Sequence, residues 1–91
     1  MQIGILEMPA EGTWRVQLDG ELIPGYLKLN IRNGRWTIKF NRDGKLEPLR
    51  TEPHSREAAA SLLLFHHFEQ ERKRLKAAVM AKRVEAEHAS S

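Results

Sequence analysis

The stretch from Asn33 to Leu49, NGRWTIKFNRDGKLEPL, decides how the first half of the chain folds. It opens with an Asn-Gly turn dipeptide, continues with alternating apolar and polar residues, and reaches a second turn at Asp43-Gly44. The apolar set is Trp36, Ile38 and Phe40, and the polar set is Arg35, Thr37 and Lys39. Because side chains on a strand point alternately to opposite sides, this pattern predicts a strand with one buried and one solvated side.

The same alternation recurs upstream between further turn signals. Asp-Gly and Asn-Gly dipeptides are typical of two-residue type I′ hairpin turns, in which both residues take positive φ. Firm strands are expected at 13–18, 26–31 and 35–40, a weaker one at 2–7, and a short one at 46–50. Pro48 makes the last of these an edge strand. The pattern predicts an antiparallel meander of three to five strands, and it leaves open whether the first strand pairs in this sheet.

The chain changes character after Thr51. Ser55 is a plausible N-cap, Glu57 suits the first turn of a helix, and no Gly or Pro follows Pro53. One helix is therefore expected to run to about His88. Its first part can lie across the sheet and is richly apolar over more than one stripe of the helix: Ala58, Ala59, Leu62, Leu63, Leu64, Phe65 and Phe68. We predict an α+β fold, with one sheet-plus-helix domain at 1–68 and a helical extension at 69–91 that overhangs the sheet.

Sorting the three firm strands by parity separates two faces of the predicted sheet. One face is wholly apolar and is the expected core: Trp14, Val16, Leu18, Leu27, Leu29, Ile31, Trp36, Ile38 and Phe40. The other face has four cations, four neutral polar groups, one tyrosine and no acid: Thr13, Arg15, Gln17, Tyr26, Lys28, Asn30, Arg35, Thr37 and Lys39. Solvated sheet faces usually carry both charge signs, because opposite charges on neighbouring strands stabilise each other. An acid-free face therefore has two interpretations: an ordinary solvated surface, or a surface that binds an anionic partner.

Nucleic acid fits this chemistry best. Arg and Lys pair with phosphates or guanine, Asn and Gln can read adenine, and sheets enter DNA grooves. The net charge of +3 and the pI near 9.6 permit such binding without establishing it. We expect a small non-enzymatic module that binds nucleic acid, with DNA favoured. Its expected contact residues are Arg15, Gln17, Lys28, Asn30, Arg35, Thr37 and Lys39.

Residues 33 to about 65 resemble AP2-like domains, the three-stranded-sheet-plus-helix modules of plant transcription factors and of the arm-type N-termini of phage and transposon integrases. The shared points are Trp36, an alternating strand that ends at Phe40, the Asp43-Gly44 hairpin and the helix start at Glu57. The resemblance implies that the exposed sheet face docks in the DNA major groove. It would implicate Arg35, Thr37 and Lys39, with Arg15 and Lys28 on the neighbouring strands.

A second hypothesis concerns the helical extension, which carries a basic cluster and a thin apolar stripe. Its expected contact residues are Arg72, Leu75, Lys76 and Val79, with Ala86 further along. Such an apolar stripe would be exposed to solvent in a monomer, and it could pair with a second copy of the chain or lie in a groove of a partner protein. The protein would then be an interaction module of the phage or mobile-element type that binds and modulates or inhibits a host protein, and that could do so as a homodimer through the C-terminal helix.

Other classes of function find little support in the composition. The chain has no cysteine, and the adjacent His66 and His67 point about 100° apart on a helix, so we expect no metal site and no cofactor. No nucleophile or phosphate-loop motif occurs, so we expect no enzyme. The N-terminus lacks the basic and apolar regions of a signal peptide, and no apolar run could span a membrane. We expect a soluble cytoplasmic protein.

Overall fold

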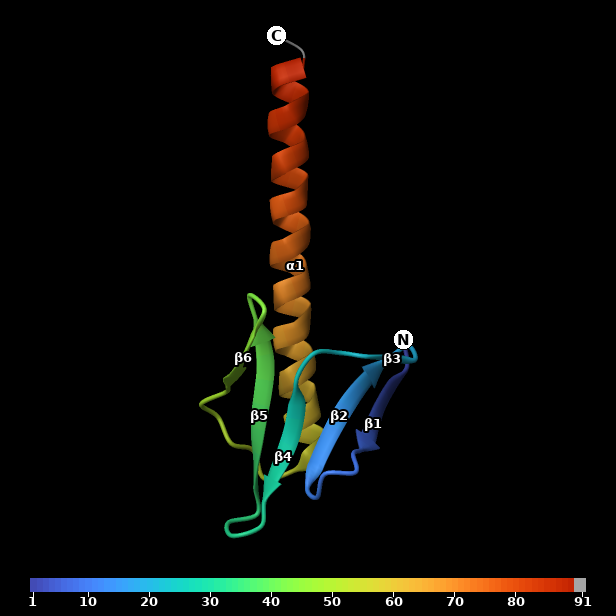
Figure 1. The fold of residues 1–91 in the computed structure, drawn as a ribbon, viewed down its shortest axis with the longest axis vertical. Helices are drawn as coiled ribbons and strands as arrows, with labels where there is room; N and C mark the ends of the chain where they lie inside the picture. The colour runs from blue at the N-terminus through green and yellow to red at the C-terminus, as the bar shows by residue number, and fades with distance from the viewer. Residues whose placement is uncertain (90–91) are drawn as a thin grey trace.

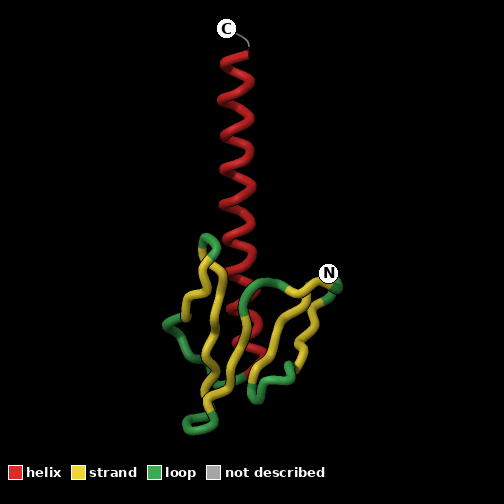
Figure 2. Tube along the Cα trace, in the orientation of Figure 1, coloured by secondary structure: helices red, strands yellow, loops and turns green. Residues whose placement is uncertain are grey.

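The computed structural model of the protein describes the backbone of residues 1–89 and the side chains of residues 1–82. Its elements are β1 (Ile3–Glu7), β2 (Thr13–Leu18), β3 (Glu21–Leu22), β4 (Tyr26–Asn30), β5 (Arg35–Arg42), β6 (Lys45–Pro48) and α1 (Arg56–Ala89). The strands form one antiparallel sheet in the order β1-β2-β4-β5-β6, and β3 pairs with the end of β2. Figure 2 shows the strands as one layer, with the helix as a second layer behind it. The predicted α+β class is confirmed, and the first strand pairs in the same sheet.

The helix is much longer than the sheet that it covers. A helix of 34 residues is about 51 Å long, and the whole molecule extends over 62 × 27 × 19 Å. Figure 1 shows α1 leaving the sheet and continuing alone to its end at Ala89. The start of the helix follows the expected N-cap, because the Ser55 Oγ accepts a hydrogen bond from the Ala58 N–H at 3.0 Å.

The core lies between α1 and one face of the sheet, on the side that parity predicts. Val16, Leu27, Ile38 and Leu63 are fully enclosed, and burying one such side chain stabilises the fold by about 2 kcal/mol. The remaining buried residues are Ile23, Trp36, Phe40, Ala59, Ala60 and Leu64. Trp14, Leu18 and Leu29 pack against them half-buried, so eight of the nine predicted core residues of the sheet belong to the core.

The ninth predicted core residue, Ile31, is a correction. It is 85% exposed, because β4 ends at Asn30 and the chain turns through residues 31–34. The Gly34 N–H donates to the Asn30 carbonyl at 2.8 Å, and Asn33 does not take positive φ. The connection is therefore a four-residue loop and not the two-residue type I′ turn that Asn-Gly suggested. The Asp19-Gly20 and Asp43-Gly44 turns, in contrast, have positive φ at both residues, as expected.

The apolar first part of α1 does not all face the sheet. Ala59, Ala60, Leu63 and Leu64 are buried and Leu62 packs beside them, but Ala58, Phe65 and Phe68 are exposed. At 100° per residue, Phe65 and Phe68 lie on the opposite side of the helix from Ala59 and Leu63. The apolar residues of this part of α1 thus form more than one stripe, as expected, and only one of these stripes meets the sheet.

Candidate nucleic-acid interface

The face of the sheet turned away from α1, here called the open face, gathers all seven predicted contact residues. The strand register places Thr13 beside Lys28 and Lys28 beside Thr37. It also places Tyr26 beside Lys39 and Asn30 beside Arg35. Arg15 and Gln17 follow on β2, next to the edge strand β1. The four cations thus lie on three neighbouring strands of the sheet, β2, β4 and β5. Neighbouring strands are about 4.8 Å apart.

The edge strands add no acid to the open face. Glu7 pairs with Trp14, Glu21 with Leu18, and Glu47 with Phe40. Cross-strand partners point to the same side of a sheet, so these three glutamates lie on the side that α1 covers. They are the acidic residues of the six strands, and the open face is acid-free over its whole width. The sequence alone could not show this, because the registers of β1, β3 and β6 are set by pairing and not by alternation.

Three of the seven predicted contact residues form side-chain hydrogen bonds with backbone groups of the protein. The Arg15 Nη2 donates to the Ile23 carbonyl at 2.9 Å, and the side chain is half-buried. The Gln17 Nε2 donates to the Gly20 carbonyl at 2.8 Å. The Asn30 Oδ1 accepts from the Arg32 N–H at 3.0 Å. These groups hold turns and the β3 segment in place, so base reading by Gln17 or Asn30 would have to use their remaining donors and acceptors.

The other four residues lie on the β4–β5 hairpin. Within the side chains of residues 1–82, no acidic group comes within ion-pair distance of Lys28, Arg35 or Lys39. Thr37 lies between these cations, opposite Lys28. Figure 1 shows the end of this hairpin projecting beyond β2. Arg35 therefore lies at the projecting end of the hairpin, beside Asn30, whereas Lys39 lies near the start of β4, beside Tyr26.

A shallow hollow on the open face adjoins the end of the hairpin. It has a volume of about 310 Å³ and is lined by Lys28, Leu29, Asn30, Ile31, Arg32 and Thr37. Arg32 belongs to the loop and was not among the predicted contacts, because parity assigns no side to a loop residue. The hollow combines two cations, polar groups and the exposed Ile31, which suits a sugar-phosphate unit or a base edge.

The size of the hairpin also suits a groove of duplex DNA. Arg35 and Lys39 are four residues apart on one strand, hence about 13 Å from each other along it. The major groove of B-DNA is about 12 Å wide and admits a two-stranded ribbon.

At the margins of the open face the register adds exposed leucines: Leu6 beside Arg15, Leu22 beside Gln17, and Leu46 beside Asn41. The face is thus basic in the middle and apolar at its edges.

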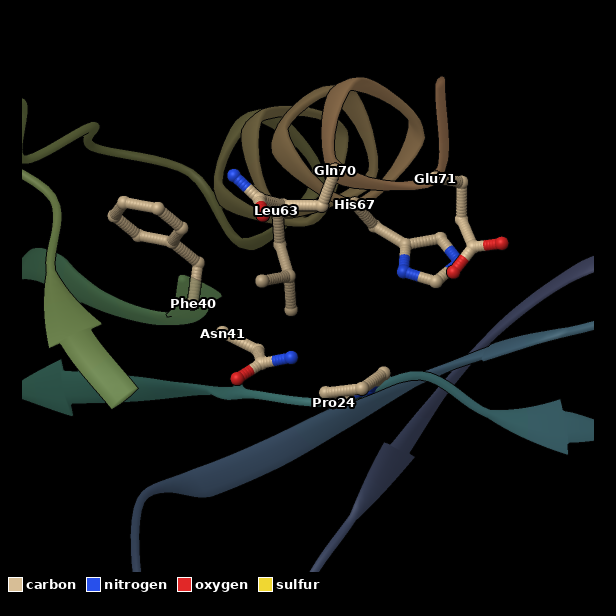
Figure 3. Close-up of a pocket in the computed structure, with 7 residues that line it drawn as sticks. All are labelled: Pro24, Phe40, Asn41, Leu63, His67, Gln70 and Glu71. Atoms are coloured by element: carbon tan, nitrogen blue, oxygen red, sulfur yellow. The ribbon is translucent and has the colours of Figure 1, made fainter. Parts of the chain in front are cut away.

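Between the helix and the sheet, Figure 3 shows a small hollow that lies at the boundary of the core. It holds about 50 Å³ and is lined by Pro24, Phe40, Asn41, Leu63, His67, Gln70 and Glu71. Ligand pockets typically have about 300–1,000 Å³, so this one has room only for a few water molecules. His66 packs on Phe40 with ring centroids 4.8 Å apart. Both histidines therefore serve as boundary residues, and the described part of the chain contains no group of three potential metal ligands.

A wider and more open groove of about 500 Å³ separates the Asp43-Gly44 turn from α1. Its helix side carries both charge signs, with Gln70, Glu71, Lys73, Arg74 and Ala77. Glu71 and Arg74 form an ion pair of 2.8 Å, and the hydrogen bond between them lowers the pKa of Glu71 and raises that of Arg74. Because these charges largely satisfy one another, the groove is a weaker anion site than the open face.

The residues predicted for the second hypothesis lie on the free part of α1. Arg72, Leu75, Lys76 and Val79 are all exposed, and Ala86 lies beyond the side chains that the structure describes.

In residues 1–89 no helix has the length and apolar content needed to cross a membrane. Comparison with protein-family models, with curated proteins and with solved structures yields no match for this chain.

Proposed function

We propose that the protein is a small nucleic-acid-binding module, with double-stranded DNA as the favoured ligand, and that the open face is its contact surface. The observation that carries the proposal is the segregation of charge across the sheet. Every glutamate of the strands lies on the helix side, and Lys28, Arg35 and Lys39 lie together on the other side. A partner rich in phosphate would restore the opposite charges that this face lacks.

The resemblance to AP2-like domains supports the same mode of binding. In such a mode the β4–β5 hairpin enters the major groove, and Arg35, Thr37 and Lys39 approach the base edges. Lys28 and Arg32, around the hollow at the hairpin's end, contact the phosphates, and Arg15 adds charge while it holds the Ile23 carbonyl.

The strength of binding should depend steeply on salt. About four phosphate contacts predict a loss of affinity of about a hundredfold between about 50 and 200 mM salt, because each contact releases condensed counterions. Fluorescence polarisation of a labelled random duplex at these salt concentrations measures this slope directly. A weaker slope would mean that fewer cations touch the phosphates than the open face offers.

The matched variants are two double charge reversals, one on β5 and one across β5 and β6. Arg35→Glu/Lys39→Glu changes the open face, whereas Arg42→Glu/Lys45→Glu changes a cross-strand pair on the helix side. Both variants lower the net charge of the chain from +3 to −1, so a difference between them reports location and not total charge. We expect the first variant to lose binding at least about tenfold more than the second.

Two results would overturn the proposal. One is the absence of binding by the unaltered protein at low salt. The other is an equal loss in both double variants, which would mean that only the net charge matters. Circular dichroism of each variant shows whether the fold persists, and substituting single-stranded DNA or duplex RNA for the DNA duplex tests the choice of ligand.

A further inference from the structure

The helix α1 has a second apolar stripe on the side away from the sheet. Phe65 is 55% exposed, Phe68 38%, Leu75 58% and Val79 53%. At 100° per residue these four side chains fall within an arc of about 80°, and the centre of that arc lies opposite the buried Leu63. Arg72 falls inside the arc and Lys82 at its margin. We call these six residues the outer stripe.

The spacing within the outer stripe is that of a coiled coil. Its positions, 65, 68, 72, 75, 79 and 82, are separated alternately by three and four residues. Alternating steps of three and four define the a and d positions of a heptad repeat, in which two helices pack side by side. The stripe begins over the sheet and continues along the free part of α1, so both halves of the helix contribute to one surface.

We propose that the outer stripe is the seam of an antiparallel homodimer, in which α1 of a second copy lies along α1 of the first. A heptad stripe is complementary to another helix with the same repeat, and α1 is the one helix among the residues that the structure describes. The sheet does not obstruct such a partner, because it packs on the opposite side of α1.

The two cations of the stripe favour the antiparallel orientation. In a parallel pair, Arg72 would face Arg72 and Lys82 would face Lys82 of the second copy. In an antiparallel pair centred between residues 73 and 74, Arg72 faces Leu75, Phe68 faces Val79, and Lys82 faces Phe65. Both like-charge layers disappear, and the long side chains can cover apolar groups with their stems.

The charges that flank the stripe select the same arrangement. In the antiparallel register centred between 73 and 74, Glu69 of each copy lies beside Lys76 of the other. Sliding the pair by one heptad would bring Glu69 against Glu69 or Lys76 against Lys76. Glu71, the acid that would meet Lys76 in a parallel pair, is already held by Arg74 at 2.8 Å. The surface is therefore self-complementary, as a two-fold interface requires.

Sedimentation velocity of the full chain, without nucleic acid, tests the proposal. The 10.5 kDa chain should sediment as a dimer at high concentration, with a micromolar dissociation constant for a seam of about six layers. Leu75→Glu should weaken the dimer by at least about a hundredfold, because it buries an unpaired carboxylate in each half of the seam. Ala81→Glu is the matched control, since residue 81 is exposed and lies on the other side of the helix. It should leave the dimer intact.

Charge swaps test the orientation. Lys76→Glu should weaken the dimer several-fold, and Glu69→Lys/Lys76→Glu should restore it, because the two charges meet between the copies. The proposal is overturned if the chain stays monomeric at about 200 µM, a concentration far above a micromolar dissociation constant. Equal effects of Leu75→Glu and Ala81→Glu, or rescue by Glu71→Lys/Lys76→Glu in place of the Glu69 pair, overturn it as well. None of these results depends on nucleic-acid binding.

Discussion

The two faces of the sheet are made from alternate residues of the same strands, yet one face forms the core and the other is basic and open to solvent. On the covered face, Ile38 of β5 is fully buried between the sheet and the helix, and its neighbours in the core are apolar. On the open face, the adjacent Thr37 is only half-buried and lies among cations. Neighbouring residues of one strand thus belong either to the core or to the proposed contact surface, so substitutions can test stability and the proposed binding separately.

The largest expected effect concerns this neighbouring pair. Ile38→Ala should lower the free energy of unfolding by about 4 kcal/mol, because it removes buried methyl groups and leaves a cavity. Thr37→Ala should change it by less than about 0.5 kcal/mol, since its side chain faces solvent. Urea denaturation followed by tryptophan fluorescence measures both values. Similar losses in the two variants would contradict the separation of the faces.

A comparably large effect is expected where the strand β4 begins. Gly25 has a φ of 101°, and a Cβ at this position would collide with the Lys39 carbonyl and crowd Leu63. Gly25→Ala should therefore destabilise the fold by about 3 kcal/mol or more. Gly20→Ala is the control: Gly20 also has positive φ, but open space surrounds it, so only about 1 kcal/mol is at stake. Thermal unfolding by circular dichroism should rank the two variants in this order.

A smaller change in the free energy of unfolding is expected at the start of α1, the helix that packs on the covered face of the sheet. Ser55→Ala removes the hydroxyl that accepts from the Ala58 N–H, and it should cost about 1 kcal/mol. Ser55→Asp should retain the cap and stay close to the unaltered protein. Chemical denaturation distinguishes the two, and equal midpoints for Ser55→Ala and the unaltered chain would show that water replaces the cap without loss.

The smallest effect should come from the ion pair at the sheet edge. Arg42 and Glu47 lie 3.7 Å apart, and both side chains are well exposed. Glu47→Gln should change the free energy of unfolding by less than about 0.5 kcal/mol, because solvent and salt screen such pairs. Denaturation at low and high salt checks this, and a loss above 1 kcal/mol would mean that the edge is more tightly packed than its exposure suggests.

Much of the fold follows from the sequence because strand alternation is a strict period. It identified the covered face of β2, β4 and β5, and Asp-Gly identified two type I′ turns from the need for positive φ at both residues. Ser55 identified the helix start. These features rest on local geometry, which a few residues determine.

The features that the sequence did not show depend on contacts between distant segments. Ile23 is buried although it belongs to no strand, because the Ile23 N–H bonds to the Val16 carbonyl and holds the loop on the sheet. The two-residue strand β3 is too short for alternation to reveal. Which of the apolar helix residues meet the sheet, and that Phe65 and Phe68 do not, also depends on packing, because composition gives the number of apolar side chains and not the width of the contact. In the same way, alternation placed Gln17 and Asn30 on the open face, but it could not show that both side chains form hydrogen bonds with backbone groups.

The placement of the sheet and the outer stripe on opposite sides of α1 has a consequence for the proposed assembly. A two-fold pair would hold its two sheets about 30 Å apart along the helices, with their open faces turned outward in opposite directions. Such a pair could not grip one straight duplex with both faces. It would instead act as a bridge that tethers two separate duplexes, so binding would draw DNA molecules together and turbidity would rise with protein concentration until single dimers saturate each duplex.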